Sequence, residues 1–285
     1  MSDLGAFESV FRRALRDRFE YAAIRLERIL IITDLEEAAA SAFQEQVQRY
    51  LSHALSLRGI EVSIWDKRQF APWPQLKQRI KQYAPDLIVT YRLLWVEDMT
   101  ATKSLGSYVD LLSQDTQYPI LIMPHPALQG MDPILTDPGA VMVATEHGYA
   151  NHRMVNFALS LLPEKRPLFL VHIEDQDTFD YYMKAIGKIP DIDTEAAHET
   201  IQHQLLAGPQ QYADSVAETL AEIRPGVDIQ THIMFGHLID AYRSLMKTHE
   251  TDLLVVDTKD DTQLAMHSVG YSLAVEFRQT PVLLL

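Results

Sequence analysis

The chain has 285 residues, of which 47% are apolar and 22% are charged, and this balance predicts a soluble globular protein large enough for two domains. Its formal net charge of −14 argues against nucleic acid or an anionic membrane as the main partner, because both surfaces repel acidic proteins. The absence of cysteine excludes disulfides, thiolate catalysis and cysteine metal sites. No apolar run approaches the roughly 20 residues that span a bilayer, and the N-terminal stretch mixes charges instead of forming a signal-peptide core. We therefore expect a cytosolic protein.

The first half of the chain alternates apolar strands with helices. Residues 7–26 carry apolar side chains at helical spacing, with arginines mainly on the polar side, which predicts an amphipathic helix packed on a sheet edge or on a partner subunit. Strands are predicted at 28–34, 60–66, 86–90 and 118–123, and helices at 36–57, 75–83 and around 103–112. Gly59 ends the longest of these helices, and Asp34 closes the first strand.

A segment rich in proline and glycine, residues 124–139, is predicted to link this half to a second one. The second half restarts with a strand that ends in an acid, as the first strand did. Strands are predicted at 141–146, 167–173, 227–234, 253–256 and 281–285, with helices at 149–162, 210–223, 238–249 and before the last strand. The acidic and less periodic residues 175–206 are predicted to form a helical excursion beyond the core.

The two halves repeat one another. Short apolar runs on either side of a helix, without alternation, indicate buried parallel strands, and Asp252–Leu285 has a weaker copy at Asp86–Met123. Asp34 and Glu146, at the ends of the first strands, are 112 residues apart, and Asp86 and Asp252 are 166 apart, so the second half holds 166 − 112 = 54 additional residues between its first and fourth strands. We therefore predict four strands in the first half and five in the second. The expected division is an N-terminal helix (1–27), a shortened first domain (28–124), a linker (125–139) and a second domain (140–285).

This order of elements, with a Gly-His turn, DLLVV and a final TPVLLL, resembles the universal stress protein family. The resemblance is best over Val227–Leu285, fair over Val141–Ile173 and weaker over Arg28–Met123, and the two halves resemble the tandem members of the family. It implies an α/β fold of two tandem, doubly wound parallel-sheet domains of the adenine nucleotide alpha hydrolase-like type, with ligand at the carboxyl ends of the strands. It also implies an intramolecular pseudo-dimer in which Tyr118–Met123 pairs with Thr280–Leu285.

Family members that bind ATP carry Gly-x2-Gly-x9-Gly-Ser/Thr after the fourth strand, where glycines let the backbone approach the phosphates and N–H groups supply donors. The corresponding positions here are Asp257, Asp260, Gly270 and Tyr271, with Ser272 one place later. Only the third glycine is present, and each carboxylate would repel a polyphosphate by roughly 1 kcal/mol or more. The first half keeps Gly106–Ser107 but lacks the other glycines. We predict that neither half binds ATP in the family's usual way and that no cofactor is required.

Further candidate ligand contacts lie near the predicted strand ends: Asp34, Thr145, Glu146, His172, His237 and Lys259. Asp34 and Glu146 correspond to acids near the family's adenine pocket, or they are ordinary strand-end caps. Lys259 either binds phosphate or belongs to a salt-bridged turn. His237 either starts a helix or contacts a phosphate at that helix N-terminus.

Other residues give weaker signals. Tyr181–Met183 either line a small apolar pocket or cover the sheet edge. His147 and His152 lie near an acid, but their spacing matches no zinc signature such as HExxH, so no metal is predicted. The sequence has no nucleophile elbow, Walker loop or GxGxxG motif, and the neighbours His267 and Ser268 point in different directions on a helix. We therefore expect that the protein is not an enzyme.

Two functions of different classes follow. The first is a non-catalytic tandem stress protein that binds a protein partner or a small ligand; the alternative is a weak adenine-nucleotide-binding protein with slow ATPase or phosphotransfer activity. The missing glycines favour the first. A third possibility is another ligand in a remodelled second-half pocket near Glu146, His172 and Asp257, although fold alone does not select a ligand. The N-terminal helix could in addition support a homodimer.

Overall fold

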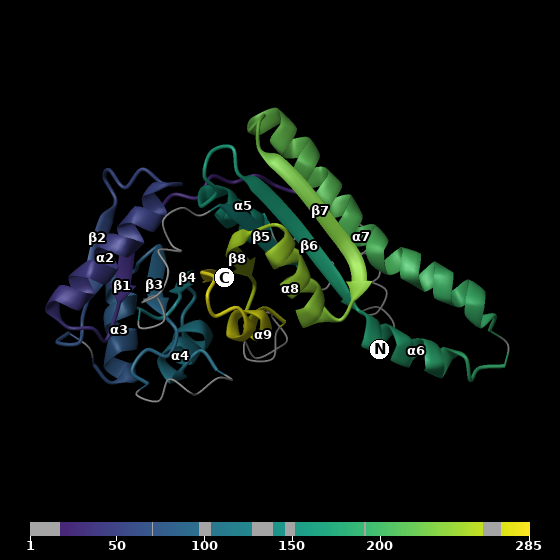
Figure 1. Cartoon of the computed structure of the whole chain (residues 1–285), viewed down its shortest axis with the longest axis horizontal. Coiled ribbons are helices and arrows are strands. Elements are labelled where there is room, and N and C mark those ends of the chain that lie inside the picture. The colour runs from purple at the N-terminus through teal and green to yellow at the C-terminus, as the bar shows by residue number, and fades with distance from the viewer. Residues whose placement is uncertain are drawn as a thin grey trace, which may run out of the picture.

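The apolar runs of the sequence form the strands of one continuous sheet in the computed structural model (Figure 1), which describes residues 18–69, 71–96, 104–126, 139–145, 152–190, 192–258 and 269–285. Within these residues the sheet has nine strands in the order β2-β1-β3-β4-β9-β8-β5-β6-β7. Neighbouring strands are parallel except for one pair. The predicted α/β class is confirmed.

The first half contributes four strands and three helices that the structure describes. These are β1 (Arg28–Ile32), α2 (Glu37–Ser52), β2 (Glu61–Trp65), α3 (Trp73–Tyr83), β3 (Leu87–Tyr91), α4 (Ser107–Asp115) and β4 (Ile120–Met123). The residues of β3 and β4 are all buried, because helices cover both faces of the sheet. Their continuous apolar runs were the signal by which the sequence predicted them.

The second half contributes the remaining five strands, as predicted from the 54 additional residues. Its described elements are β5 (Ala140–Thr145), α5 (His152–Ser160), β6 (Pro167–Asp175), α6 (Gln176–Ile186), α7 (Thr194–Ile223), β7 (Asp228–Gly236), α8 (Leu238–Thr248), β8 (Thr251–Val256), α9 (Val269–Glu276) and β9 (Val282–Leu284). The extra unit is α7 with β7, which adds an edge strand beside β6.

The halves meet where β4 and β9 pair antiparallel, with Leu121 opposite Leu283. This is the pairing that the resemblance implied. It makes one sheet of two halves, and the shared core of buried aliphatic side chains runs through both.

Side-chain hydrogen bonds also connect the two halves. Arg92, which is 4% exposed, donates hydrogen bonds to the carbonyl oxygens of Ala274 and Phe277 at the C-terminal end of α9. In return, the Tyr271 hydroxyl donates to Asp110 Oδ1 on α4 at 2.8 Å. Burial lowers the pKa of Arg92 to about 9 and raises the pKa of the Asp110 carboxyl. Buried polar groups cost free energy unless they are bonded, so these contacts fix how the halves pack.

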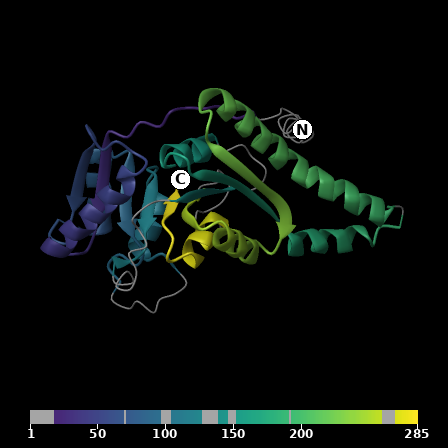
Figure 2. The same cartoon turned by 45° about the horizontal axis from the view of Figure 1, so that its top comes forward.

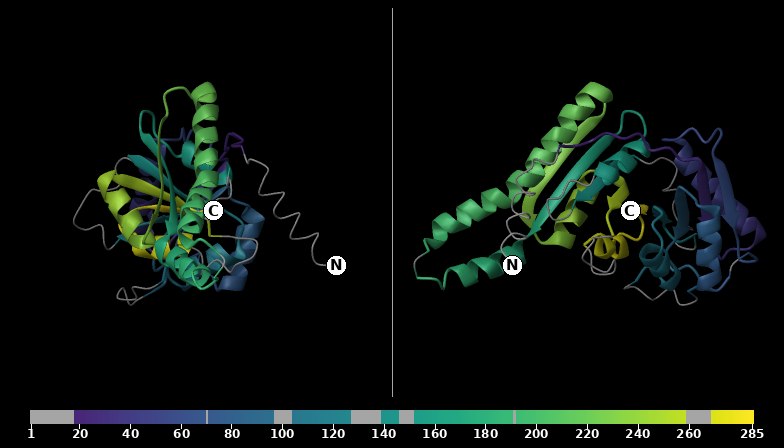
Figure 3. Two further views of the ribbon diagram at one scale, coloured as in Figure 1. Left: turned by 90° about the vertical axis from the view of Figure 1, so that its right-hand side faces the viewer. Right: turned by 180° about the vertical axis from the view of Figure 1, so that it is seen from behind.

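Helices α6 and α7 form an arm that projects beyond the sheet (Figures 2 and 3). The excursion was predicted, but its separation from the helix predicted at 210–223 is wrong, because α7 runs from Thr194 to Ile223 through Pro209. Proline removes one backbone donor from a helix, but here it is buried together with Tyr212 and Val216 against the sheet. The second part of α7 covers β7 and β6, while its first part lies on the arm.

The predicted N-terminal helix is wrong for residues 18–26, which have no regular secondary structure; residues 1–17 lie outside the described part. The reason is tertiary. The Phe19 N–H donates to Ser215 Oγ on α7 at 2.9 Å, and the Ala22 N–H donates to Asn156 Oδ1 on α5 at 3.1 Å. The Phe19 ring is buried. These N–H groups therefore donate to side chains of other elements instead of to the carbonyl oxygens four residues earlier, as a helix would require. None of the helices in the described residues has the length and apolar character needed to cross a bilayer.

Candidate functional site

Several of the predicted ligand residues lie at the carboxyl ends of the strands, the edge at which open α/β sheets bind ligands. Asp34 follows β1, and Asp257 follows β8. Thr145 ends β5 and is directly opposite His172 on β6. Glu146 and Lys259 lie outside the described residues, and their roles stay predictions.

In the first half, Asp34 holds its own loop. The Tyr91 hydroxyl donates to Asp34 Oδ1, and the Trp95 N–H donates to Asp34 Oδ2 at 2.9 Å. The Thr33 hydroxyl lies 2.9 Å from the same tyrosine oxygen. Burial and the hydrogen bond to Asp34 raise the pKa of Tyr91. Both carboxylate oxygens thus bond to the chain, which favours the structural alternative for this residue.

The surviving glycines of the nucleotide motif are packing residues. A Cβ atom on Gly270 would lie 2.2 Å from the Asp257 carbonyl oxygen, so α9 rests directly on the backbone that follows β8. Gly106 has φ +99°, and a Cβ there would lie 2.9 Å from Cα of Leu93. Both glycines are therefore required by close backbone contact within the protein.

The side chains of His237 and Ser272 are exposed. His237 precedes α8, as predicted, and its Nδ1 lies 3.3 Å from Asp177 Oδ2, with both side chains exposed. Ser272 is exposed on α9. Neither residue lines the pocket of the second half described next.

The second half contains a pocket of about 520 Å³, which we call the arm pocket. It lies where the arm leaves the sheet, and two of the predicted ligand residues, Thr145 and His172, line it. Beyond this pair β6 continues for three residues, 173–175, which pair with β7 and extend past the end of β5. The described residues that line the arm pocket are Thr145, His172, Ile173, Glu174, Asp175, Thr178, Phe179, Tyr182, Met183, Ala185, Ile186, Ile201, Leu205, Leu238 and Val269.

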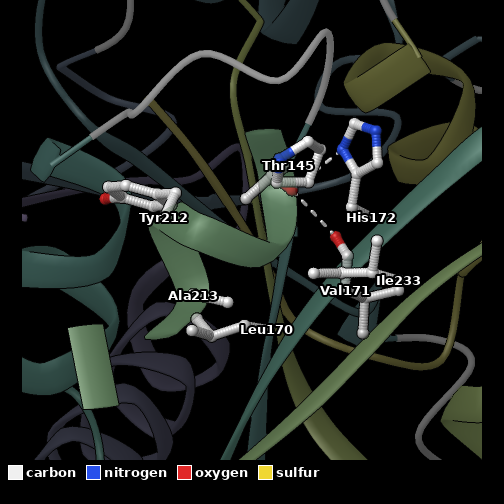
Figure 4. Close-up of a pocket in the computed structure, with 8 residues that line it drawn as sticks. Thr145, Leu170, Val171, His172, Tyr212, Ala213 and Ile233 are labelled. Atoms are coloured by element: carbon white, nitrogen blue, oxygen red, sulfur yellow. Dashed lines mark hydrogen bonds between the residues drawn. The ribbon is translucent and has the colours of Figure 1, made fainter. Parts of the chain in front are cut away.

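A chain of hydrogen bonds lies at the sheet end of the arm pocket. His172 Nε2 is 2.9 Å from Glu174 Oε1, and His172 Nδ1 is 3.3 Å from Thr145 Oγ1. Figure 4 shows the Thr145 hydroxyl between this ring and the Val171 carbonyl, 3.1 Å away. The Thr145 hydroxyl has one proton, which it donates to the Val171 carbonyl, and His172 Nε2, when protonated, donates to the Glu174 carboxylate. His172 is buried, so these bonds fix the orientation of its ring.

Behind this chain, on the side of α7, lies a second cavity of about 20 Å³ (Figure 4). Thr145 and His172 line both cavities, and Pro209 and Tyr212 of α7 close the small one. Its volume is that of a single water molecule. Of these two cavities, the arm pocket is therefore the one large enough for a ligand.

The walls of the arm pocket are mainly apolar. Helix α6 contributes Phe179 and Met183, which are buried, and Tyr182, which is 60% exposed. Its neighbour Tyr181 is 69% exposed and does not line the pocket. Tyr182 and Met183 therefore line a pocket, as one of the two alternatives had it. Sequence reasoning missed Glu174, whose i, i+2 spacing from His172 on a strand placed both on one face.

The carboxylates Glu174 and Asp175 are the charged groups among the described lining residues of the arm pocket. No lysine or arginine is among these residues. Asp175 also caps α6, since its Oδ1 accepts from the Thr178 N–H at 2.8 Å. The N-terminus of α6, which would otherwise attract anions, already faces a carboxylate of the chain.

Within the described residues no group of three or more histidine and acidic side chains is placed to hold a metal ion. The Thr145–His172–Glu174 chain has the order of a nucleophile, a base and an acid. Its hydroxyl, however, has a backbone carbonyl as an acceptor, and its histidine is almost fully buried.

No family model and no curated protein matches the sequence. Among solved structures, the chain is similar to PA1789, a functionally unknown protein from Pseudomonas aeruginosa PAO1, with 13% identity over 91% of this chain and 92% of that one and a TM-score of 0.49. A universal stress protein from Archaeoglobus fulgidus DSM 4304 shows 14% identity over 90% and 95% of the chains, with a TM-score of 0.48.

The cytoplasmic domain of a prokaryotic cation chloride cotransporter is a further structural neighbour, with 11% identity over 99% of this chain and 89% of that one and a TM-score of 0.43. Likeness at this level does not decide function. The fold described here rests on the strand order and register of the chain itself.

Proposed function

We propose that this chain is a non-catalytic, tandem-domain protein of the universal stress protein type that binds a small ligand in the arm pocket. The observation that carries the proposal is the pocket itself, about 520 Å³ in volume and bounded by apolar side chains with a few polar groups at one end. Ligand pockets of proteins have this size and composition, and they occur at the carboxyl ends of α/β strands.

Three observations support a ligand other than ATP. Gly270 is in close contact with the Asp257 backbone, so its presence is explained without a phosphate. The described lining holds carboxylates and lacks lysine and arginine, the side chains that bind polyphosphates. In the first half, Asp34 bonds to its own loop.

A non-catalytic role is supported by the polar chain. The His172 ring nitrogens have Glu174 and Thr145 as partners, and the ring is buried. A general base needs to reach a substrate proton. This histidine reaches neighbouring side chains instead, and it holds Glu174 at the pocket wall.

Isothermal titration with ATP, with and without Mg²⁺, tests the nucleotide part of the proposal. We expect no binding heat at millimolar ATP and no release of phosphate. Binding tighter than ~10 µM, which corresponds to roughly 7 kcal/mol, would contradict it and favour the alternative of a nucleotide-binding protein with slow ATPase activity.

The pocket part is tested with N-phenyl-1-naphthylamine, a neutral apolar dye whose fluorescence rises in apolar surroundings. We expect one saturable site per chain. Ala185→Trp, which adds bulk to the pocket lining on α6, is expected to weaken binding at least tenfold. Ala196→Trp, on an exposed position of α7 outside the lining, is the matched control and is expected to bind as the wild type. Unchanged binding in Ala185→Trp would place the dye elsewhere and contradict the proposal.

A further inference from the structure

The charge and capping pattern around the arm pocket indicates the class of its ligand, on the condition that the pocket is a binding site as proposed above. We propose that the ligand is a largely apolar small molecule whose polar end is neutral or cationic and donates hydrogen bonds, and that the pocket rejects anions. The polar end is received by Glu174 next to His172, and the apolar body lies between α6 and α7.

The apolar body follows from the walls. Ten of the fifteen described lining residues are apolar or aromatic, and most of these come from the two arm helices and the overhanging end of β6. Leu205, 38% exposed, lies on the α7 wall. An apolar ligand would remove such surface from water, and this is the main source of affinity in pockets of this kind.

The polar end follows from Glu174. Its Oε1 accepts from His172 Nε2 at 2.9 Å, and its side chain is 26% exposed while the imidazole is 3% exposed. The histidine therefore anchors one oxygen while the carboxylate keeps surface toward the pocket. A carboxylate accepts hydrogen bonds and attracts positive charge, so an ammonium, amide or hydroxyl group fits here, whereas a phosphate, sulfonate or carboxylate does not.

Helix N-termini are the usual anion sites of α/β proteins, and two of them lie near the arm pocket. Asp175 caps the first, that of α6, and Asp177 lies in its first turn. The second, that of α8, has Asp240 in its first turn, and the preceding His237 contacts Asp177. Acids of the chain thus already compensate both helix dipoles, which removes the usual attraction for a ligand anion.

A pair of dyes with the same ring system tests the selection. N-phenyl-1-naphthylamine is neutral, and 8-anilinonaphthalene-1-sulfonate carries one sulfonate on the same skeleton. We expect the neutral dye to bind to the folded wild type at least tenfold more tightly, because a like charge in a partly desolvated pocket is repelled. Circular dichroism in the same samples verifies that the chain is folded.

Glu174→Gln is the deciding variant, because it keeps the size of the side chain and an acceptor for the histidine while removing the charge. We expect the ratio of the affinities for the neutral and the anionic dye to fall at least about threefold in this variant. Glu199→Gln, an exposed acid on α7 outside the lining, is the matched control and is expected to leave the ratio unchanged.

The outcomes separate the two proposals. If neither dye binds to the folded wild type, the pocket is not a binding site for molecules of this class and both proposals fail. If both dyes bind with equal affinity and Ala185→Trp abolishes the binding, the proposed function stands and the charge selection is overturned. An unchanged ratio in Glu174→Gln also overturns the assignment of Glu174.

Discussion

The substitution Gly270→Ala tests whether this glycine serves packing. A methyl group at this position would lie 2.2 Å from the Asp257 carbonyl oxygen and 3.1 Å from Cβ of Val256. Comfortable non-bonded contacts of this kind are roughly 3.5 Å, so α9 would have to move away from the end of β8 by about 1 Å. Helix α9 also carries the carbonyls that Arg92 binds, and the strain therefore reaches the contact between the halves.

Overpacking a well-filled site costs about 1–3 kcal/mol, and the atom that the new methyl meets is backbone, which adapts poorly. We therefore expect Gly270→Ala to lower the free energy of unfolding by about 2–3 kcal/mol. The assay is urea denaturation followed by circular dichroism, with the slope of the transition compared between variants.

Gly187→Ala is the matched control. Gly187 ends α6 with φ −63° and ψ −8°, and a Cβ there would meet its nearest atom at 3.4 Å. An alanine fits this conformation, so the change is expected to be neutral or to stabilise by about 0.4–1 kcal/mol. If Gly270→Ala is as stable as Gly187→Ala, Gly270 is not needed for packing, and a role in binding a nucleotide becomes the better explanation of this glycine.

Three further predictions concern other contacts. Arg92→Ala removes two charge-assisted hydrogen bonds between the halves and is expected to cost about 2–4 kcal/mol in urea denaturation, whereas a loss below about 1 kcal/mol would refute its role. Asp34→Ala frees the Trp95 loop and is expected to lower stability by about 1–3 kcal/mol without changing dye affinity in the arm pocket; a weakened dye affinity would count against this assignment. Burial, with the nearby His249 charge, lowers the pKa of His232, so the unfolded chain binds more protons and stability falls as pH drops below about 6.5. The free energy of unfolding of His232→Phe is expected to fall less than that of the wild type between pH 7.5 and pH 5.5. An equal fall in both proteins would show that His232 does not cause this pH dependence.

The strands could be predicted because each is a short apolar run buried on both faces, as in β3 and β4. The helix boundaries were less accurate where tertiary contacts decide. Residues 18–26 have helical spacing, but Ser215 and Asn156 accept their backbone donors. Residues 175–206 and 210–223 were predicted as separate elements, but α7 is continuous through Pro209, which is buried with Tyr212 and Val216.

The candidate site was predicted only in part. Thr145 and His172 could be named because parallel strands bring their carboxyl ends together. Glu174 could not, because the predicted strand ended at residue 173 and the observed one extends to Asp175. The pocket walls depend on how the arm folds back against this overhang, a long-range arrangement that local periodicity does not encode.

The two halves use equivalent edges of the sheet differently because of strand length. By sheet order β6 corresponds to β2, since each lies beside the first strand of its half. Strand β2 has five residues and ends opposite the last residue of β1, whereas β6 has nine and continues for three residues past Thr145; at ~3.3 Å each, these extend the carboxyl end of β6 by about 10 Å. This overhang carries Glu174 and Asp175 past Thr145 and lifts the following arm away from the sheet, which leaves room for the arm pocket. In the first half no such overhang exists, and Asp34 binds the adjacent loop instead. One ligand per chain, bound in the second half, is therefore the stoichiometry that the architecture favours.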